Sequence, residues 1–189
     1  MARPRSEDKR DALMAAATRV IAAQGLSAPT AVIAREAGVS NGSLFTYFDT
    51  KADLFNQLYL DLKTGMAAAS LDGLAAQAPM REQFSRVWSN WMRWATSNPG
   101  RRRALARLDV SDDIAPQTRA AAHQAMAEVA GMLERARASG PMRDAPMGFV
   151  VALMNSLAEA TMDFMVSDPG RADEYSRVGF DALLRMLGS

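Results

Sequence analysis

Apolar residues recur along this chain with a helical period, and turn-forming residues divide them into segments of helical length. The i, i+3, i+4 spacing that places side chains on one helix face recurs in five groups: Leu13, Ala16, Ala17, Val20 and Ile21; Leu54, Phe55, Leu58 and Leu62; Phe84, Trp88, Trp91 and Ala95; Ala122, Met126, Val129 and Leu133; and Phe180, Leu183, Leu184 and Leu187. No segment alternates with the two-residue period of a strand. The pattern therefore predicts an all-α protein of about nine helices.

The composition excludes some classes of function but does not indicate a particular one. The chain has 189 residues, of which 49% are hydrophobic, enough for a sizeable core. It has 22 basic and 21 acidic residues and no cysteine, so bulk charge indicates no partner and cysteine chemistry is excluded. His123 is the only histidine, and we expect no metal site and no cofactor.

The most apolar stretch, residues 147–166, is a poor membrane span. It includes Asn155, Glu159 and Asp163, and charged groups are costly inside a bilayer. The N-terminus is polar and has no apolar signal-peptide core. We therefore expect a cytoplasmic protein with no membrane partner.

The residues from Pro29 to Leu54 are the most informative part of the sequence, because they predict two short helices joined by a tight turn. The first helix covers residues 31–37. Gly38 can then adopt the positive φ that a sharp turn demands, and Ser40 is a favourable N-cap for the second helix.

The second short helix, residues 41–48, is expected to have one buried and one exposed face. It is too short to be stable alone, so its neighbours must hold it, with Leu44 and Phe48 facing inward. Its outward side chains are small, polar and aromatic, as a reader of the DNA major groove requires: Asn41, Gly42, Ser43, Phe45, Thr46 and Tyr47. Gly42 would let the backbone approach DNA, and Phe45 can contact a thymine methyl group. Each residue alone would be ordinary surface, but the ordered string indicates a DNA reader.

The string AREAGVSNGSLFTYFDTKADL, residues 34–54, closely resembles the signature of the TetR (tetracycline-repressor-like) family, a pattern like AGVSxGTLYxYFxxKxxL. The turn glycine, cap serine, aromatic pair and following lysine are all in register. The resemblance implies a three-helix, helix-turn-helix DNA-binding domain at residues 1–50 and a helical ligand-binding and dimerisation domain at residues 51–189. It also implies that Asn41, Gly42, Ser43, Phe45 and Thr46 face the groove, and that Tyr47 and Lys51 hold phosphates.

Two positions depart from this signature. Phe45 stands where tyrosine is common, which removes one hydroxyl contact. The usual threonine is displaced to Thr30, after Pro29, which suits a first helical position; Thr30 remains a candidate DNA contact. Before the first helix, the basic residues Arg3, Arg5, Lys9 and Arg10 are offset by acidic neighbours, so we favour a solvated terminus over a further DNA contact.

Methionines and tryptophans supply flexible apolar volume in the second domain. For each one singly, a packed core is the ordinary explanation. Together they favour a pocket for a small apolar or aromatic effector. The candidate ligand-binding residues are Met66, Trp88, Trp91, Met92, His123, Met126, Met154, Glu159 and Met162.

Polar features of the second domain have more than one interpretation. Asn155, Glu159 and Asp163 recur every four residues and form a solvated edge, part of a dimer interface or a pocket lining, of which the solvated edge is preferred. His123 is a helix-surface residue or a ligand contact. The arginine run at residues 101–103 is expected to be a solvated cluster at a helix start rather than a nucleic-acid patch.

The last two predicted helices, residues 144–166 and 171–187, are long and apolar. In the TetR family the last two helices pair with their copies in a homodimer, and such a dimer would set two recognition helices about 34–36 Å apart. The residues expected to supply surplus apolar area are Phe149, Val150, Leu153, Leu157, Phe180, Leu183, Leu184 and Leu187.

The sequence as a whole predicts a DNA-binding transcriptional regulator, a repressor released from a palindromic operator by a small-molecule effector. The effector must bind two states with different affinity, and the coupling is expected to run through the helix starting at Lys51. A helical enzyme is the first alternative, but the sequence has no glycine-rich phosphate loop and no nucleophile elbow, so we expect no enzymatic activity. A helical adaptor is the second, and the intact string from Ser40 to Lys51 argues against it.

Overall fold

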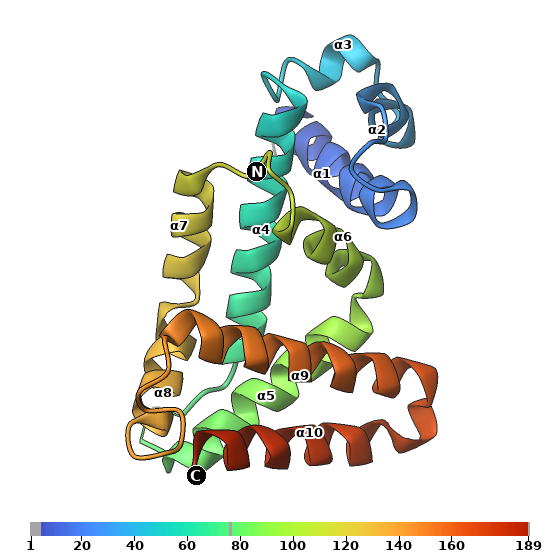
Figure 1. Cartoon of the computed structure of the whole chain (residues 1–189). Coiled ribbons are helices and arrows are strands. Elements are labelled where there is room, and N and C mark those ends of the chain that lie inside the picture. The colour runs from blue at the N-terminus through green and yellow to red at the C-terminus, as the bar shows by residue number, and fades with distance from the viewer. Residues whose placement is uncertain (1–4, 76, 189) are drawn as a thin grey trace. The chain divides into compact units, whose positions relative to one another are not determined.

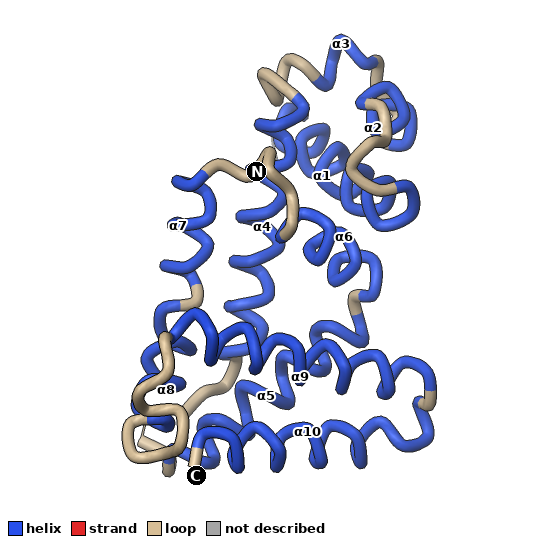
Figure 2. Tube along the Cα trace, in the orientation of Figure 1, coloured by secondary structure: helices blue, strands red, loops and turns tan. Residues whose placement is uncertain are grey.

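The computed structural model of the chain describes residues 5–75 and 77–188, and every regular element in this part of the chain is a helix (Figure 1, Figure 2). The first half contains α1 (Arg5–Gln24), α2 (Thr30–Glu36), α3 (Asn41–Leu44), α4 (Lys51–Leu71) and α5 (Met80–Ser97). The second half contains α6 (Pro99–Asp109), α7 (Pro116–Ala125), α8 (Ala127–Arg137), α9 (Met147–Ser167), the short 3-10 helix η1 (Pro169–Arg171) and α10 (Ala172–Leu187). The predicted all-α class is confirmed.

Helix boundaries differ from the prediction at the α7–α8 junction, at the start of α9 and at the end of α3. The described residues form ten α-helices and one 3-10 helix, where about nine helices were expected. Met126 belongs to the apolar period from Ala122 to Leu133, but its backbone, with φ −96° and ψ 6°, leaves the helical conformation and separates α7 from α8. Helix α9 begins at Met147, later than expected, because Pro146 has an extended backbone with φ −56° and ψ 136°.

The helices are grouped in two compact units that share α4. The first unit contains the residues up to Gly65 together with Asn98–Ala125, and the second contains Met66–Ser97 together with the residues from Met126 onward. The domain boundary predicted at residue 50 separates DNA binding from ligand binding, whereas the two units are defined by packing. The units therefore do not test this boundary, which stays a prediction.

The predicted apolar faces form the core of the first unit. The α1 and α4 groups are buried throughout: Leu13, Ala16, Ala17, Val20, Ile21, Leu54, Phe55, Leu58 and Leu62. Helix α1 packs against both α2 and α6. Arg107 of α6 donates a hydrogen bond to the carbonyl oxygen of Ile21 near the C-terminal end of α1. The last turn of α1 has no basic residue of its own, so Arg107 supplies positive charge where the helix dipole is negative.

The second unit is built on α5, α9 and α10. Helices α9 and α10 lie side by side (Figure 1), and α5 packs against both. The Trp88 ring lies 6.3 Å from the Phe180 ring, and its Nε1 donates a 2.9 Å hydrogen bond to the carbonyl oxygen of Ser176. Gly179 permits this close packing, because a Cβ atom there would lie 2.4 Å from Thr161 Oγ1.

The surface of α9 and α10 shows which apolar residues are surplus to this core. Of the eight residues expected to supply that surplus, five are buried within the second unit, so the prediction was wrong for Val150, Phe180, Leu183, Leu184 and Leu187. They face inward because α9 and α10 use these stripes to pack on α5 and on each other. The exposed large apolar side chains of the two helices are Phe149, Phe164, Val166 and Val178.

Helix α9 has the length and composition of a membrane-crossing helix, with a mean hydropathy of 1.4 over its most apolar window. Its polar stripe, Asn155, Glu159 and Asp163, is exposed along one edge. Two ionisable groups on one face would be costly to place in a bilayer. Their exposure in the single chain agrees with a solvated edge and equally with a dimer interface, so the preferred solvated edge stays a prediction.

Candidate nucleic-acid interface

Helix α3 begins as the sequence predicts. Gly38 has a φ of +71°, and the Ser40 Oγ atom accepts a 3.1 Å hydrogen bond from the backbone N–H of Ser43. The helix ends at Leu44, however, and not at Phe48. The chain continues in tight turns, in which Thr46 N–H bonds to the Ser43 carbonyl three residues back. The predicted helix was too long because the chain after Leu44 tightens into three-residue turns that bring Phe48 into the core.

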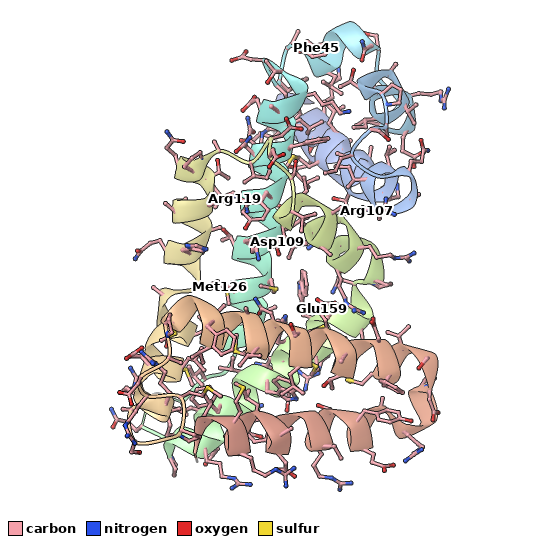
Figure 3. All side chains as sticks on the ribbon, in the orientation of Figure 1. Phe45, Arg107, Asp109, Arg119, Met126 and Glu159 are labelled. Atoms are coloured by element: carbon pink, nitrogen blue, oxygen red, sulfur yellow. The ribbon has the colours of Figure 1, made fainter. Side chains whose placement is uncertain are left out.

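The inward and outward sides of this segment are as predicted. Leu44 and Phe48 are buried, with exposed fractions of 0% and 1%. Asn41, Gly42, Phe45 and Thr46 are exposed, while Ser43 and Tyr47 are half-buried. Phe45 is 43% exposed, unusual for a large apolar side chain (Figure 3). We call residues 41–47 the reading segment.

Hydrogen bonds within the reading segment fix its hydroxyl groups. Thr46 Oγ1 donates a 2.7 Å hydrogen bond to the Ser43 carbonyl oxygen. The Ser43 and Ser40 hydroxyls share a 2.9 Å hydrogen bond. The Thr46 hydroxyl therefore presents an acceptor to any external group, and it is held in place before such a group arrives.

Gly42 is not required by the chain's own packing. Its φ is not positive, and an added Cβ atom would meet only the Ser40 Oγ atom, at 4.0 Å. A glycine is destabilising in a helix when nothing internal needs it. Gly42 lies on the exposed face, where a methyl group in its place would be accommodated without a clash.

The two remaining DNA-contact candidates stand at helix starts. Thr30 is the first residue of α2 and is half-buried, whereas Pro29, expected to suit the first helical position, is the N-cap just before it. Lys51 is the first residue of α4 and is half-buried. Its Nζ atom lies 5.3 Å from the centroid of the Phe55 ring, a cation–π distance that orients the side chain.

Sequence reasoning missed the cap that orients α4 just after the reading segment. The Thr50 Oγ1 atom accepts a 3.0 Å hydrogen bond from the backbone N–H of Asp53. The Asp53 carboxylate accepts a 3.2 Å hydrogen bond from the N–H of Asp49 in return. The arrangement differs from a capping box in that Asp53 binds the N–H of Asp49, one residue before the Thr50 cap, and not the N–H of Thr50 itself. The signal was present in the sequence as TKAD before an apolar run.

Arg10 and Gln57 extend this network to α1. Gln57 Nε2 donates to both carboxylate oxygens of Asp53 at 3.0 Å, and Arg10 Nη2 donates to Gln57 Oε1 at 2.7 Å. The Arg10 guanidinium also lies 5.9 Å from the centroid of the Phe48 ring. Arg10 therefore joins α1 to α4 instead of belonging to a merely solvated terminus. Arg3 lies outside the described residues.

The candidate ligand-binding residues are divided between the two units. Met66, Trp88, Met92, Met154 and Met162 are buried in the second unit, where Trp91 and Met126 are half-buried. The indole N–H of Trp88 is already bonded within that unit, so this side chain offers only an apolar surface.

The two polar ligand candidates are exposed. Glu159 lies on the open edge of α9, and His123 lies on α7 in the first unit. Exposure of His123 agrees with the helix-surface alternative. Arg101 and Arg103, at the start of α6, are exposed as expected for a solvated cluster.

Residues 13–58 match the family model described as bacterial regulatory proteins of the tetR family. Solved structures resemble the chain over nearly its whole length. A protein from Shewanella sp. PV-4, assigned to the tetR family of transcription regulators, is 26% identical with a TM-score of 0.82, covering 93% of this chain and 95% of its own. A TetR-family regulator from Marinobacter aquaeolei VT8 is 22% identical with a TM-score of 0.80, covering 97% of each chain.

LfrR from Mycobacterium smegmatis, a TetR-like transcriptional regulator solved with proflavine, shares the fold with 19% identity and a TM-score of 0.67, over 96% of each chain. The matched segment, residues 13–58, contains the capped turn and the whole reading segment. Residues 13–58 therefore match the TetR family, and the chain as a whole has the fold of TetR-family transcription regulators.

Proposed function

We propose that this protein is a transcriptional repressor that binds a palindromic operator as a homodimer and leaves it when a small apolar or aromatic effector binds. The observation that best supports DNA reading is an exposed, pre-ordered reading segment whose glycine the fold itself does not need. In this proposal Asn41, Ser43 and Thr46 offer hydrogen-bonding groups to base edges. Phe45 contacts a thymine methyl group.

Phosphate contacts are assigned to the residues that flank the reading segment. Tyr47 and Thr30 offer hydroxyl groups, and Lys51 offers a charge at the start of α4. Such contacts fix the register of the protein on the duplex without reading the sequence. In this proposal the protein acts in the cytoplasm, where it binds its operator.

The dimer is supported by apolar surface that the isolated chain leaves exposed. Phe149, Phe164, Val166 and Val178 on α9 and α10 are each at least 51% exposed. Large apolar side chains left exposed on two helices that pack side by side are candidates for an interaction surface. A symmetric dimer is the simplest way to cover such a surface, because each copy presents the same patch to the other.

In this proposal the effector binds among the methionine and tryptophan side chains of the second unit. Met66, Met92, Met154 and Met162 are flexible side chains that can repack around a guest. The shared fold with LfrR, solved with the planar aromatic molecule proflavine, makes a compound of that kind a reasonable first probe. In this proposal the protein acts by binding, not by turnover.

Selection of bound duplexes from a randomised DNA pool is the first experiment. We expect an enriched palindrome with half-sites about one helical turn apart. Absence of enrichment, with only weak binding that salt abolishes, would overturn the DNA-reader proposal and favour the adaptor alternative.

Two glycine variants then separate DNA contact from folding. Gly42→Ala and Gly65→Ala both place a methyl group where no clash occurs, the second in the middle of α4. Both variants are expected to fold at least as stably as wild type. Only Gly42→Ala is expected to lose operator affinity, by about tenfold or more if the backbone approaches DNA closely. Equal operator affinity in the two variants contradicts the proposed contact.

Two valine variants test the dimer surface. Val178 on α10 is 55% exposed, and Val110, after α6, is 82% exposed. Val178→Asp is expected to yield monomers in sedimentation, while Val110→Asp leaves the dimer intact. A monomeric wild-type protein, or a dimer that survives Val178→Asp, contradicts this assignment.

Proflavine titration tests the effector. We expect quenching of tryptophan emission together with release of the selected operator. Tight binding with unchanged operator affinity would refute effector control, because a ligand shifts an equilibrium only by its differential affinity.

A further inference from the structure

Asn56 of α4 uses both ends of its side-chain amide to hold the link between α6 and α7. Its Nδ2 atom donates a 2.7 Å hydrogen bond to the carbonyl oxygen of Asp113, and a second of 2.7 Å to that of Ala52. Its Oδ1 atom accepts a 2.8 Å hydrogen bond from the N–H of Ala115. One side chain thus satisfies two backbone groups of a segment more than fifty positions away, and we call residues 109–115 the α6–α7 link.

Asp109 anchors the start of the same link to α4. Tyr59 Oη donates a 2.9 Å hydrogen bond to one carboxylate oxygen of Asp109, and Lys63 Nζ lies 3.1 Å from the other. Tyr59 is 2% exposed. Burial and the adjacent Asp109 charge raise the pKa of Tyr59, so its hydroxyl remains a donor.

Arg119 of α7 holds the link from its other side (Figure 3). Its Nη1 atom donates to the carbonyl oxygen of Asp109 at 3.0 Å, and its Nη2 atom to that of Ser111 at 2.8 Å. The Arg119 guanidinium also lies 5.8 Å from the Tyr59 ring centroid. The link is therefore fixed by side chains of α4 and α7 although it lies between helices.

The neighbouring positions of α4 hold the end of the reading segment. Asp53 and Gln57 bind Asp49 and Arg10, whereas Asn56 and Tyr59 bind the link. These positions fall on adjoining turns of one rigid helix. A displacement of the link therefore has a direct mechanical route, through α4, to the residues that follow the reading segment.

We propose that Asn56 is a positioning residue for DNA reading, which fastens the α6–α7 link to α4 and thereby keeps the reading segment ordered. The role of Asn56 in operator binding rests on the proposed function, but its effect on the order of residues 41–50 does not. All groups involved belong to the first unit.

The chain offers a matched control in Asn90. Asn90 Nδ2 also donates to two backbone carbonyl oxygens, those of Ser70 and Asp72, at 3.2 and 2.8 Å, but in the second unit. Asn56→Asp and Asn90→Asp each replace an amide donor by a carboxylate oxygen that repels the same two carbonyls. Tyr59→Phe is a milder third variant, which removes only the hydroxyl that binds Asp109.

Hydrogen exchange of the full-length protein without DNA is the deciding measurement. Urea is used to bring all variants to the same global stability before exchange is measured. Under these conditions Asn56→Asp is expected to speed hydrogen exchange of the amides of residues 41–50 by about tenfold, because one satisfied hydrogen-bonding group is lost. Tyr59→Phe should give a smaller increase, and Asn90→Asp none. Faster exchange confined to residues 109–115, or an equal change in the Asn56 and Asn90 variants, overturns the proposal.

Operator binding completes the test with the duplex selected above. Asn56→Asp is expected to weaken operator binding by about tenfold more than Asn90→Asp does. If wild type selects no duplex, the proposed function fails while the exchange result still decides the positioning role. If wild type binds and both aspartate variants bind equally, Asn56 has no positioning role in DNA reading.

Discussion

Gly179→Ala is the substitution for which the structure makes the sharpest stability prediction. The added methyl carbon would lie 2.4 Å from Thr161 Oγ1 and 3.0 Å from Trp88 Cζ2. Favourable carbon contacts begin at about 3.5 Å. Three helices of the second unit meet at this point: α10 with Gly179, α9 with Thr161 and α5 with Trp88.

Two opposing terms set the magnitude. Overpacking of a well-filled core costs about 1–3 kcal/mol, and alanine improves helix propensity over glycine by about 1 kcal/mol. Thr161 and Trp88 are only 6% and 3% exposed, so neither can turn outward to relieve the clash. We therefore take the upper part of the range and expect a net loss of about 2 kcal/mol. For a chain of this size that lowers the melting temperature by about 4–8 °C.

Thermal unfolding followed by circular dichroism measures this loss, at fixed protein concentration because a dimer melts in a concentration-dependent way. Gly65→Ala is the control, since its methyl group meets nothing within 4 Å, and it should raise stability by about 0.5–1 kcal/mol. Adding Thr161→Ala to Gly179→Ala should recover stability relative to the sum of the single changes. A folded Gly179→Ala variant that melts at or above wild type refutes the packing argument.

Three further measurements follow from particular contacts. Thr50→Ala removes the α4 cap and should lower the free energy of unfolding by about 1 kcal/mol in urea titrations; an unchanged midpoint contradicts the capping role. Trp88→Phe removes the indole hydrogen bond to the Ser176 carbonyl, which keeps its place in α10, and should cost about 0.5–1.5 kcal/mol by the same assay. The Arg171 guanidinium lowers the pKa of Glu174, so their contact stabilises the fold above the ordinary glutamate pKa and is lost as the pH falls through the depressed value. The small stability gap between wild type and Glu174→Gln should therefore close in acid, and a gap independent of pH would contradict this.

Local patterns in the sequence were enough for the helices and for the reading segment. The apolar stripe of α1 is buried because a 3.6-residue period leaves it on one face whatever it packs against. Gly38 and Ser40 act through their own backbone and their nearest neighbours, so their roles as turn and cap could be predicted from the sequence. Leu44 and Phe48 followed from the same short-range reasoning.

Contacts between residues that are far apart in the sequence could not be predicted from local patterns. Arg107 binds the Ile21 carbonyl across 86 positions, and Asn56 binds the link across 57. No local spacing distinguishes either residue from an ordinary polar surface residue on a helix. The length of α3 was also misjudged, because the chain after Leu44 follows its tertiary contacts rather than its helical propensity.

DNA binding and effector binding, the two parts of the proposed function, leave unequal signals in the sequence for one physical reason. A protein that recognises a DNA sequence must expose a short, ordered segment. The exposed positions and the capped turn of such a segment lie on consecutive residues, so their pattern is visible in the sequence. A pocket for an apolar effector uses the same methionines and tryptophans as a packed core, so composition cannot separate them. Trp88 shows the consequence: its ring packs against Phe180 and its N–H binds the chain itself. Residues that bind an effector must therefore be found by their response to a ligand, whereas candidates for DNA binding can be proposed from the sequence.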